Sequence, residues 1–353
     1  MRHTKIISSR MYSGQGLGNQ LWIYATTRAF AAEHQIEYRI ECSWRFKGKK
    51  FLSLYPGRRG LYLPLKYPRR SHIGIFEDRY VEEKWRIPGF SFDFAPYKEF
   101  SSGKRRFRIE GNFESEQYLV DIREQLKKEL QVANPIKIPE SLCIISIRGG
   151  DYLGNSETLL DKNYYLTAIE LMKAQYAKVN FAIVTDDAGY AKEMLPGIPV
   201  LTGSIANYTF PTASDSGKIE LDFSILQNAK KLIIGNSSFA WWATWTNPNS
   251  PFVIAPRFWD AYKSRLQVWA PNSILTKDWF WLSKEGILRS YEEESQLIDR
   301  AIVPNINKVS DAFVTSNWIA GKPRHALRNW FFGKFENMTW FRIVNSWRKR
   351  ILK

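Results

Sequence analysis

Residues 142–152 read LCIISIRGGDY, an apolar run from Leu142 to Ile147 followed by an arginine and two glycines. The run has the length and composition of a buried strand, so it predicts a strand that places Arg148 at its carboxyl end. Open α/β sheets bind ligands at that edge, and a guanidinium there can hold a phosphate with two hydrogen bonds. The alternative interpretation is a plain ion pair between Arg148 and Asp151 at a strand end.

Strands and helices alternate on both sides of this stretch, which predicts an α/β chain. Upstream we expect strands at 5–9, 36–42 and 107–112, a glycine turn at 14–18, and helices at 20–34 and 116–131. Downstream we expect strands at 142–147, 180–185, 199–202 and 231–234, and helices at 163–178, 188–195, 218–228 and 238–246. Residues 43–107 show no period and are expected to form loops along a cleft. The prediction is two Rossmann-like domains, residues 1–134 and 135–284, that face this cleft across a hinge at 133–139.

Residues 285–353 are expected to form a helical C-terminal extension that is basic and aromatic. The net charge of the chain is +16. The segment from Lys322 to Lys353 contains nine Lys or Arg and one acid, Glu336, so it carries half of this excess. At helical spacing the aromatic residues form one stripe flanked by cations, which is typical of a helix lying on an anionic membrane surface. The predicted membrane contacts are Trp330, Phe331, Arg342, Trp347 and Arg348. Packing of this helix on the main body, or nucleic-acid binding, would use the same residues.

The rest of the composition narrows the classes of protein. No run of about 18 apolar residues and no signal peptide appear, so we expect a cytoplasmic protein, peripheral on the inner face of the membrane. The two cysteines, Cys42 and Cys143, are far apart, and the four histidines lack ligand spacing. We therefore expect no disulfide and no metal site.

Three further stretches carry chemical information. Residues 14–20, GQGLGNQ, follow a predicted strand and open a helix, so the amides of Gly16, Gly18, Asn19 and Gln20 could approach a phosphate or a sugar. Asn19 stands where a dinucleotide-binding motif has its third glycine, and a purely structural turn is the alternative. The turn with Asn236, Ser237, Ser238 and Phe239 precedes a helix and could bind an anion, or its serines could simply cap that helix. Asp222, at the start of an apolar helix, could accept both hydrogens of the Watson–Crick edge of guanine, although acids are common at such positions.

The motifs together resemble glycosyltransferase family 11, the α-1,2-fucosyltransferases. They are GLGNQ at 16–20, FESEQY at 113–118, RGGDY at 148–152, TDD at 185–187 and NSSFAWWATW at 236–245. The resemblance covers about Tyr12 to Leu282. It implies a GT-B fold, GDP-L-fucose as the donor substrate, inversion at the sugar carbon, and no cofactor or metal.

By this resemblance Arg148 contacts the donor β-phosphate, Ser237, Ser238 and Phe239 form the phosphate-side loop, and Asp222 reads guanine. Asp186 and Asn236 are further donor-binding candidates. Two positions depart from the family motif, since Ser146 replaces a histidine and Gly149 replaces a second arginine. Charge grows on the departing phosphate during transfer, and an arginine with helix-terminal donors would stabilise it. A carboxylate could act as general base, and the candidates are Asp151 and Glu114. The predicted catalytic residues are Arg148 and Asp151.

These observations predict an inverting fucosyltransferase that moves L-fucose from GDP-β-L-fucose to a glycan hydroxyl, with α-1,2 linkage, in surface-polysaccharide or lipid-linked glycan synthesis. The expected partners are the nucleotide-sugar donor, the glycan acceptor and an anionic membrane surface, and no nucleic acid. A related inverting transferase with another GDP-sugar is the alternative among enzymes. A glycan-binding protein without activity, or a nucleic-acid-binding protein, is the alternative from other classes.

Overall fold

The computed structural model describes residues 6–52, 77–81, 106–111, 113–154, 158–201, 204–205, 208–209, 218–257 and 274–302. The chain divides into two units, Met1–Arg300 and Ala301–Lys353, and the first contains nearly all of the described residues. We call the described residues up to 134 the N-terminal half and those from 135 onward the C-terminal half. The basic and aromatic segment from Lys322 to Lys353, with its predicted membrane contacts, lies outside the described residues.

The N-terminal half is built on a parallel sheet with the strand order β2-β1-β4-β3. Its strands are β1 (Ile6–Arg10), β2 (Glu37–Glu41), β3 (Glu77–Val81) and β4 (Arg106–Glu110). The helix α1 (Leu17–Glu33) connects β1 to β2, as predicted, but it begins three residues earlier than expected. The prediction of loops alone for residues 43–107 was wrong, because β3 pairs with β4 along five residues. The sequence of β3, EDRYV, lacks the apolar alternation that would have indicated a strand.

The C-terminal half contains a second sheet, with the order β12-β11-β10-β9-β5-β6. Its strands are β5 (Leu142–Ile147), β6 (Asn180–Thr185), β9 (Lys231–Ile233), β10 (Phe252–Pro256), β11 (Phe280–Leu282) and β12 (Leu288–Arg289). All neighbours are parallel except β12, which runs antiparallel to β11 and carries the sheet past residue 284. The strand β5 is buried at all six positions, as its apolar run predicted.

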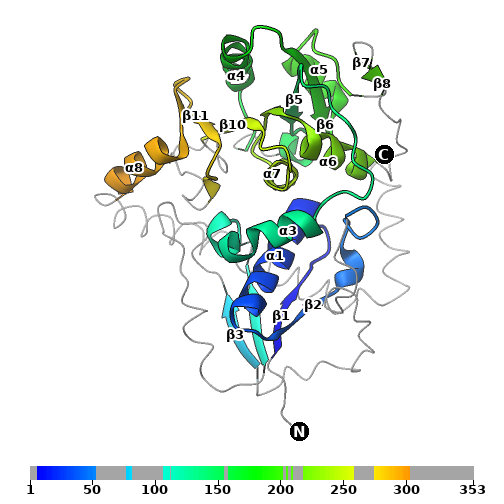
Figure 1. The fold of residues 1–353 in the computed structure, drawn as a ribbon, viewed down its shortest axis with the longest axis vertical. Helices are drawn as coiled ribbons and strands as arrows, with labels where there is room; N and C mark the ends of the chain where they lie inside the picture. Colours follow the sequence, from blue (N-terminus) through cyan, green and yellow to red (C-terminus); the bar gives the residue numbers. More distant parts are fainter. Residues whose placement is uncertain are drawn as a thin grey trace. The chain divides into compact units, whose positions relative to one another are not determined.

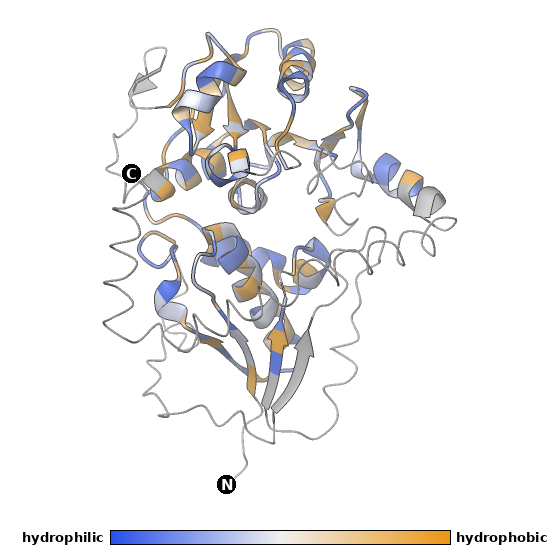
Figure 2. Ribbon diagram, turned by 180° about the vertical axis from the view of Figure 1, so that it is seen from behind, coloured by the Kyte–Doolittle hydropathy of each residue, from blue (hydrophilic) through white to orange (hydrophobic). Residues whose placement is uncertain are grey.

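Helices connect the strands of the second sheet and cover it (Figure 1). They are α4 (Lys162–Gln175), α5 (Ala188–Met194), α6 (Lys218–Asn228) and α7 (Ser238–Trp245), and a further helix, α8 (Tyr291–Ile302), follows the last strand, β12. Figure 2 shows hydrophobic residues along the strands of this sheet. The strand predicted at 199–202 is only a single bridge from Val200 to Ile183, and a short hairpin, β7 (Ser204–Ile205) with β8 (Tyr208–Thr209), follows it. The class expected from the sequence, α/β with a mainly parallel sheet in each half as in the GT-B fold, is confirmed.

The two halves meet where α1 packs against α7 (Figure 1). The indole ring of Trp22 lies 4.2 Å from that of Trp241 and 4.7 Å from that of Trp242, and all three side chains are fully buried. The helix predicted at 116–131 begins as a 3-10 helix, η2 (Glu116–Ile122), and continues as α3 (Arg123–Glu129). Glu116 of η2 accepts a hydrogen bond from Nε1 of Trp245 at 2.9 Å, which is a second link between the halves. The aromatic composition of α7 therefore fixes this junction.

Strand order explains where a ligand would bind. In the second sheet the chain passes from β5 to β6 on one side and later returns to β9 on the other side of β5. Such a reversal leaves a crevice at the carboxyl ends of the two central strands. Arg148 follows β5, and the turn that starts α7 follows β9. No helix among the described residues has the length and hydrophobicity needed to cross a membrane.

Candidate active site

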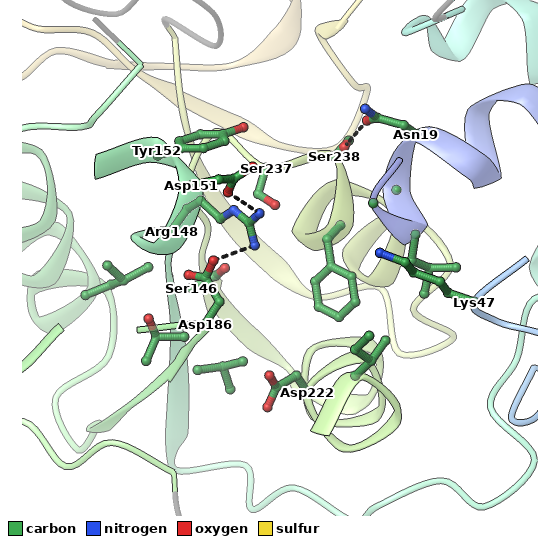
Figure 3. A pocket seen from close by; sticks show the side chains of 18 of the residues that line it. Asn19, Lys47, Ser146, Arg148, Asp151, Tyr152, Asp186, Asp222, Ser237 and Ser238 are labelled. Carbon is green, nitrogen blue, oxygen red and sulfur yellow. Dashed lines mark hydrogen bonds and ion pairs between the residues drawn. The ribbon is translucent and has the colours of Figure 1, made fainter. Parts of the chain in front are cut away.

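A pocket of about 300 Å³ lies at the carboxyl ends of β5 and β9, and both halves line it (Figure 3). The N-terminal half contributes Gly14, Gly16, Leu17, Gly18, Asn19 and Lys47. The C-terminal half contributes Ser146, Ile147, Arg148, Asp151, Tyr152, Val184, Thr185, Asp186, Ile219, Asp222, Ser237, Ser238 and Phe239. The structure thus brings together ten of the predicted site residues. They are Gly16, Gly18, Asn19, Arg148, Asp151, Asp186, Asp222, Ser237, Ser238 and Phe239.

Arg148 is held between two carboxylates at the side of this pocket (Figure 3). Its NH1 atom lies 2.6 Å from Oδ2 of Asp186, and its NH2 atom lies 2.5 Å from Oδ1 of Asp151. Asp186 is itself fixed, because its Oδ1 accepts a hydrogen bond from the amide of Gly149 at 2.9 Å. The side chain of Asp151 is 71% exposed and that of Asp186 is 30% exposed. Arg148 therefore lines the pocket and is also ion-paired with Asp151, as the alternative interpretation of the RGGD turn expected.

The two glycines after Arg148 allow this arrangement. Gly150 has a φ of +43°, and a Cβ atom there would lie 2.4 Å from Oδ2 of Asp186. A Cβ atom at Gly149 would lie 2.8 Å from Cβ of Asp187 and 3.0 Å from the ring of Tyr190. Any side chain at position 149 would therefore collide with the start of α5.

The glycine turn of the N-terminal half reaches the C-terminal half directly. A Cβ atom at Gly18 would lie 2.4 Å from the backbone carbon of Ser238, so only glycine allows the first turns of α1 and α7 to approach this closely. Next to it, the hydroxyl of Ser238 donates a hydrogen bond to Oδ1 of Asn19 at 2.8 Å. Gly18 and Asn19 thus join the two walls of the pocket.

Gln20, which we predicted to bind the donor, does not line the pocket. Its side chain is buried, and its Nε2 donates to the carbonyl of Arg45 while its Oε1 accepts from the amide of Lys47, both at 2.9 Å. These bonds fix the segment that carries Lys47 to the pocket. Lys47 was missed by the sequence analysis, because the pairing of Gln20 with a loop 27 positions along the chain leaves no local pattern.

The start of α7 forms the wall beside Arg148. Ser237 is the N-cap residue, but its side chain makes no capping hydrogen bond, so simple capping does not explain the two serines. The first amides of a helix lack partners within it and carry partial positive charge. Asn236 lies behind this wall, where it is buried, donates to the carbonyl of Thr158 at 2.7 Å and accepts at its own carbonyl from the hydroxyl of Tyr152 at 3.2 Å. Asn236 does not line the pocket and instead supports the turn.

Asp222 lies on α6 and lines the pocket together with Ile219 and Phe239. The ring of Phe239 packs edge-on against that of Phe223 on the same helix, at 5.5 Å between centroids. This contact ties the start of α7 to the helix that carries Asp222. Glu114, the second candidate for a general base, does not line the pocket.

The charged residues of the lining are two cations, Lys47 and Arg148, and three carboxylates, Asp151, Asp186 and Asp222. Within the part of the chain that the structure describes, no group of three or more His, Cys, Asp or Glu side chains is arranged to hold a metal ion. What distinguishes the pocket chemically is an oriented arginine beside a helix N-terminus, which together can stabilise growing negative charge on an oxygen.

Comparison with known proteins agrees with the motifs. The family model described as glycosyl transferase family 11 matches residues 76–283. An alpha-1,2-colitosyltransferase of Escherichia coli is 26% identical over 275 residues, which cover 69% of this chain and 89% of that protein. The O-antigen biosynthesis glycosyltransferase WbnK of Escherichia coli is 27% identical over 123 residues, which cover 33% of this chain and 38% of that protein. Among solved structures, a mutant of Arabidopsis thaliana FUT1 in complex with GDP has a TM-score of 0.45 at 10% identity, covering 71% of this chain and 70% of that chain.

Proposed function

The chain belongs to glycosyltransferase family 11, and from this premise we propose that it transfers L-fucose from GDP-β-L-fucose to a hydroxyl group of a glycan, with inversion and α-1,2 linkage. The observation that carries the proposal is the placement of Arg148 beside the start of α7, in the crevice between β5 and β9. A leaving GDP gains charge on its β-phosphate, and a preorganised arginine with unpartnered helix amides stabilises that charge.

The geometry around Arg148 supports distinct roles for its two acidic neighbours. Asp186 is anchored by the amide of Gly149, so it holds the guanidinium in place when the donor binds. Asp151 is mostly exposed and belongs to the short helix η3 (Gly150–Gly154), so a phosphate oxygen can take its place on Arg148. Asp151, once released, is the carboxylate that we propose as general base toward the acceptor hydroxyl. Glu114 is not proposed for this role, because it lies outside the pocket lining.

The donor site is tested by titrating the protein with GDP, UDP and GDP-fucose, and by repeating the titration with Arg148→Ala and Asp222→Asn. We expect GDP to bind more tightly than UDP, and Asp222→Asn to remove this preference by weakening GDP alone. Arg148→Ala is expected to lower the transfer rate about 100-fold, the loss of one donor to a developing oxyanion. Equal affinity for GDP and UDP in the wild type, or an unchanged rate in Arg148→Ala, would contradict the proposal.

A second donor follows from the relative that is named for colitose transfer. Colitose is L-fucose without its 3-hydroxyl group, so GDP-colitose could occupy the same pocket. Initial rates with GDP-fucose and GDP-colitose at equal concentrations separate the two candidates. A site that hydrogen-bonds the 3-hydroxyl would reject colitose by a large factor, whereas an apolar site would discriminate weakly.

We also propose that the acceptor belongs to surface-polysaccharide or lipid-linked glycan synthesis, and that the enzyme acts at the inner face of the membrane. The O-antigen relative and the cationic, aromatic composition of residues 322–353 support this setting. Deleting Lys322–Lys353 is expected to abolish binding to vesicles that contain anionic lipid, without loss of donor binding. Unchanged vesicle binding by the shortened protein would refute the membrane role.

A further inference from the structure

Lys47 lies across the pocket from Arg148, on the N-terminal half (Figure 3). It follows the short helix η1 (Ser43–Arg45), which comes after β2. Its ammonium group is turned toward the pocket, and the guanidinium of Arg148 extends from the opposite side. The two cations of the pocket therefore belong to different halves of the molecule.

The backbone that carries Lys47 is fixed on both sides. Gln20 holds the carbonyl of Arg45 and the amide of Lys47, and both hydrogen bonds come from one buried side chain. Between them Phe46 is 1% exposed and packs against Tyr24 at 6.3 Å between ring centroids. A binding residue gains precision from such a rigid support.

The charges of the pocket explain what Lys47 could contribute. Arg148 is shared by two carboxylates, while Lys47 forms no ion pair with another described residue. The residue after Arg148 is a glycine that packs against Asp187 and Tyr190 and adds no charge to the pocket. A diphosphate that entered the pocket would therefore meet one engaged cation on the C-terminal half and one unengaged cation on the N-terminal half.

We propose that Lys47 is the second cation for the donor diphosphate, on the wall of the pocket opposite Arg148. The inference rests on the proposed function, because it requires a nucleoside diphosphate in the pocket. The ammonium donates hydrogen bonds to phosphate oxygens from the N-terminal half, and Arg148 does so from the C-terminal half. Binding of the donor then joins the two halves through its phosphates.

Calorimetric titration with guanosine, GMP and GDP at one fixed salt concentration tests this assignment. Lys47→Met should weaken GDP binding about tenfold, the effect of one hydrogen bond to a charged group, and should leave guanosine binding unchanged. Lys47→Arg keeps the charge and should retain most of the GDP affinity. Lys49→Met is the matched control, because Nζ of Lys49 donates to the carbonyl of Trp44 at 3.1 Å and does not line the pocket. Melting temperatures equal to wild type establish that each variant is folded.

The outcomes separate this inference from the function on which it rests. Unchanged GDP affinity in Lys47→Met, together with a clear loss in Arg148→Ala, overturns the role of Lys47 and leaves the donor site intact. Equal weakening of guanosine and GDP in Lys47→Met also overturns it, since the lysine would then shape the pocket without contacting phosphate. No preference of the wild type for GDP over guanosine contradicts the proposed function itself.

Discussion

Replacing Gly18 by alanine tests whether the close approach of α1 and α7 builds the pocket. The new Cβ atom would lie 2.4 Å from the backbone carbon of Ser238, whereas ordinary contacts begin at 3.4 Å. The Cβ atom is fixed to the backbone of α1, and the carbon of Ser238 belongs to the backbone of α7, so one helix must move by about 1 Å. Overpacking of this kind costs about 1–3 kcal/mol. For a unit of this size the melting temperature should fall by roughly 2–10 °C.

The same displacement should reach the chemistry. The backbone next to Gly18 is that of Ser238 and Phe239, where we place the donor phosphates, and a 1 Å misplacement of reacting groups can lower a rate by about 100-fold. Thermal unfolding and initial transfer rates are measured on Gly18→Ala and on Gly189→Ala as the control. Gly189 lies in α5 and does not line the pocket, and a Cβ atom there would meet only Oδ1 of Asp187, at an ordinary contact distance of 3.5 Å. Equal melting temperatures and rates in the two variants would refute this reasoning.

Three other predictions concern the ion pairs and the core. In a titration, Asp151→Asn should bind GDP more tightly than wild type, because Arg148 loses a competing carboxylate. The same variant should have a lower kcat, because Asp151 is the proposed base. Weaker GDP binding would show instead that Asp151 orients the arginine. Glu294→Gln should lower the free energy of unfolding in urea by about 3–5 kcal/mol, because it removes the buried negative charge that lies 2.5 Å from Nε of the buried Arg257. Burial raises the pKa of the Cys143 thiol, so the folded protein keeps a proton that the unfolded chain loses above about pH 8.5. The free energy of unfolding should therefore fall as pH rises, and at pH 9.5 the wild type should have lost about 1.4 kcal/mol more than Cys143→Ala. Unfolding free energies that follow the same pH dependence in the two proteins would contradict this.

Local patterns predicted the elements whose burial is visible in the sequence. The run from Leu142 to Ile147 is apolar throughout because β5 lies between two neighbours and under helices, so its end and Arg148 were placed correctly. The strands β11 and β12 were not predicted, since three and two residues are too short to show a period. The strand β10, FVIAP, was not predicted either, because an apolar run of this length does not distinguish a strand from a helix.

The site was predictable where a motif is local and not where it depends on tertiary contact. Ser237 and Ser238 were predicted from one turn and Asp222 from the start of one helix, and all three line the pocket. Gln20 belongs to the same motif as Gly18, but its role is to hold a distant loop, which only the folded chain brings near. The start of α1 was placed too late because Gly18 was interpreted as a turn residue, whereas it serves the contact with Ser238.

The contact of the Trp22 ring with those of Trp241 and Trp242 has a mechanical consequence for the reaction cycle. Each indole buries about 150–250 Å² on packing, so parting the halves at this point would expose surface worth on the order of 10 kcal/mol. Thermal motion does not supply that energy during turnover. We therefore expect the three tryptophans to act as a pivot, about which the halves rock to admit the donor and release GDP while their contact at the indoles persists.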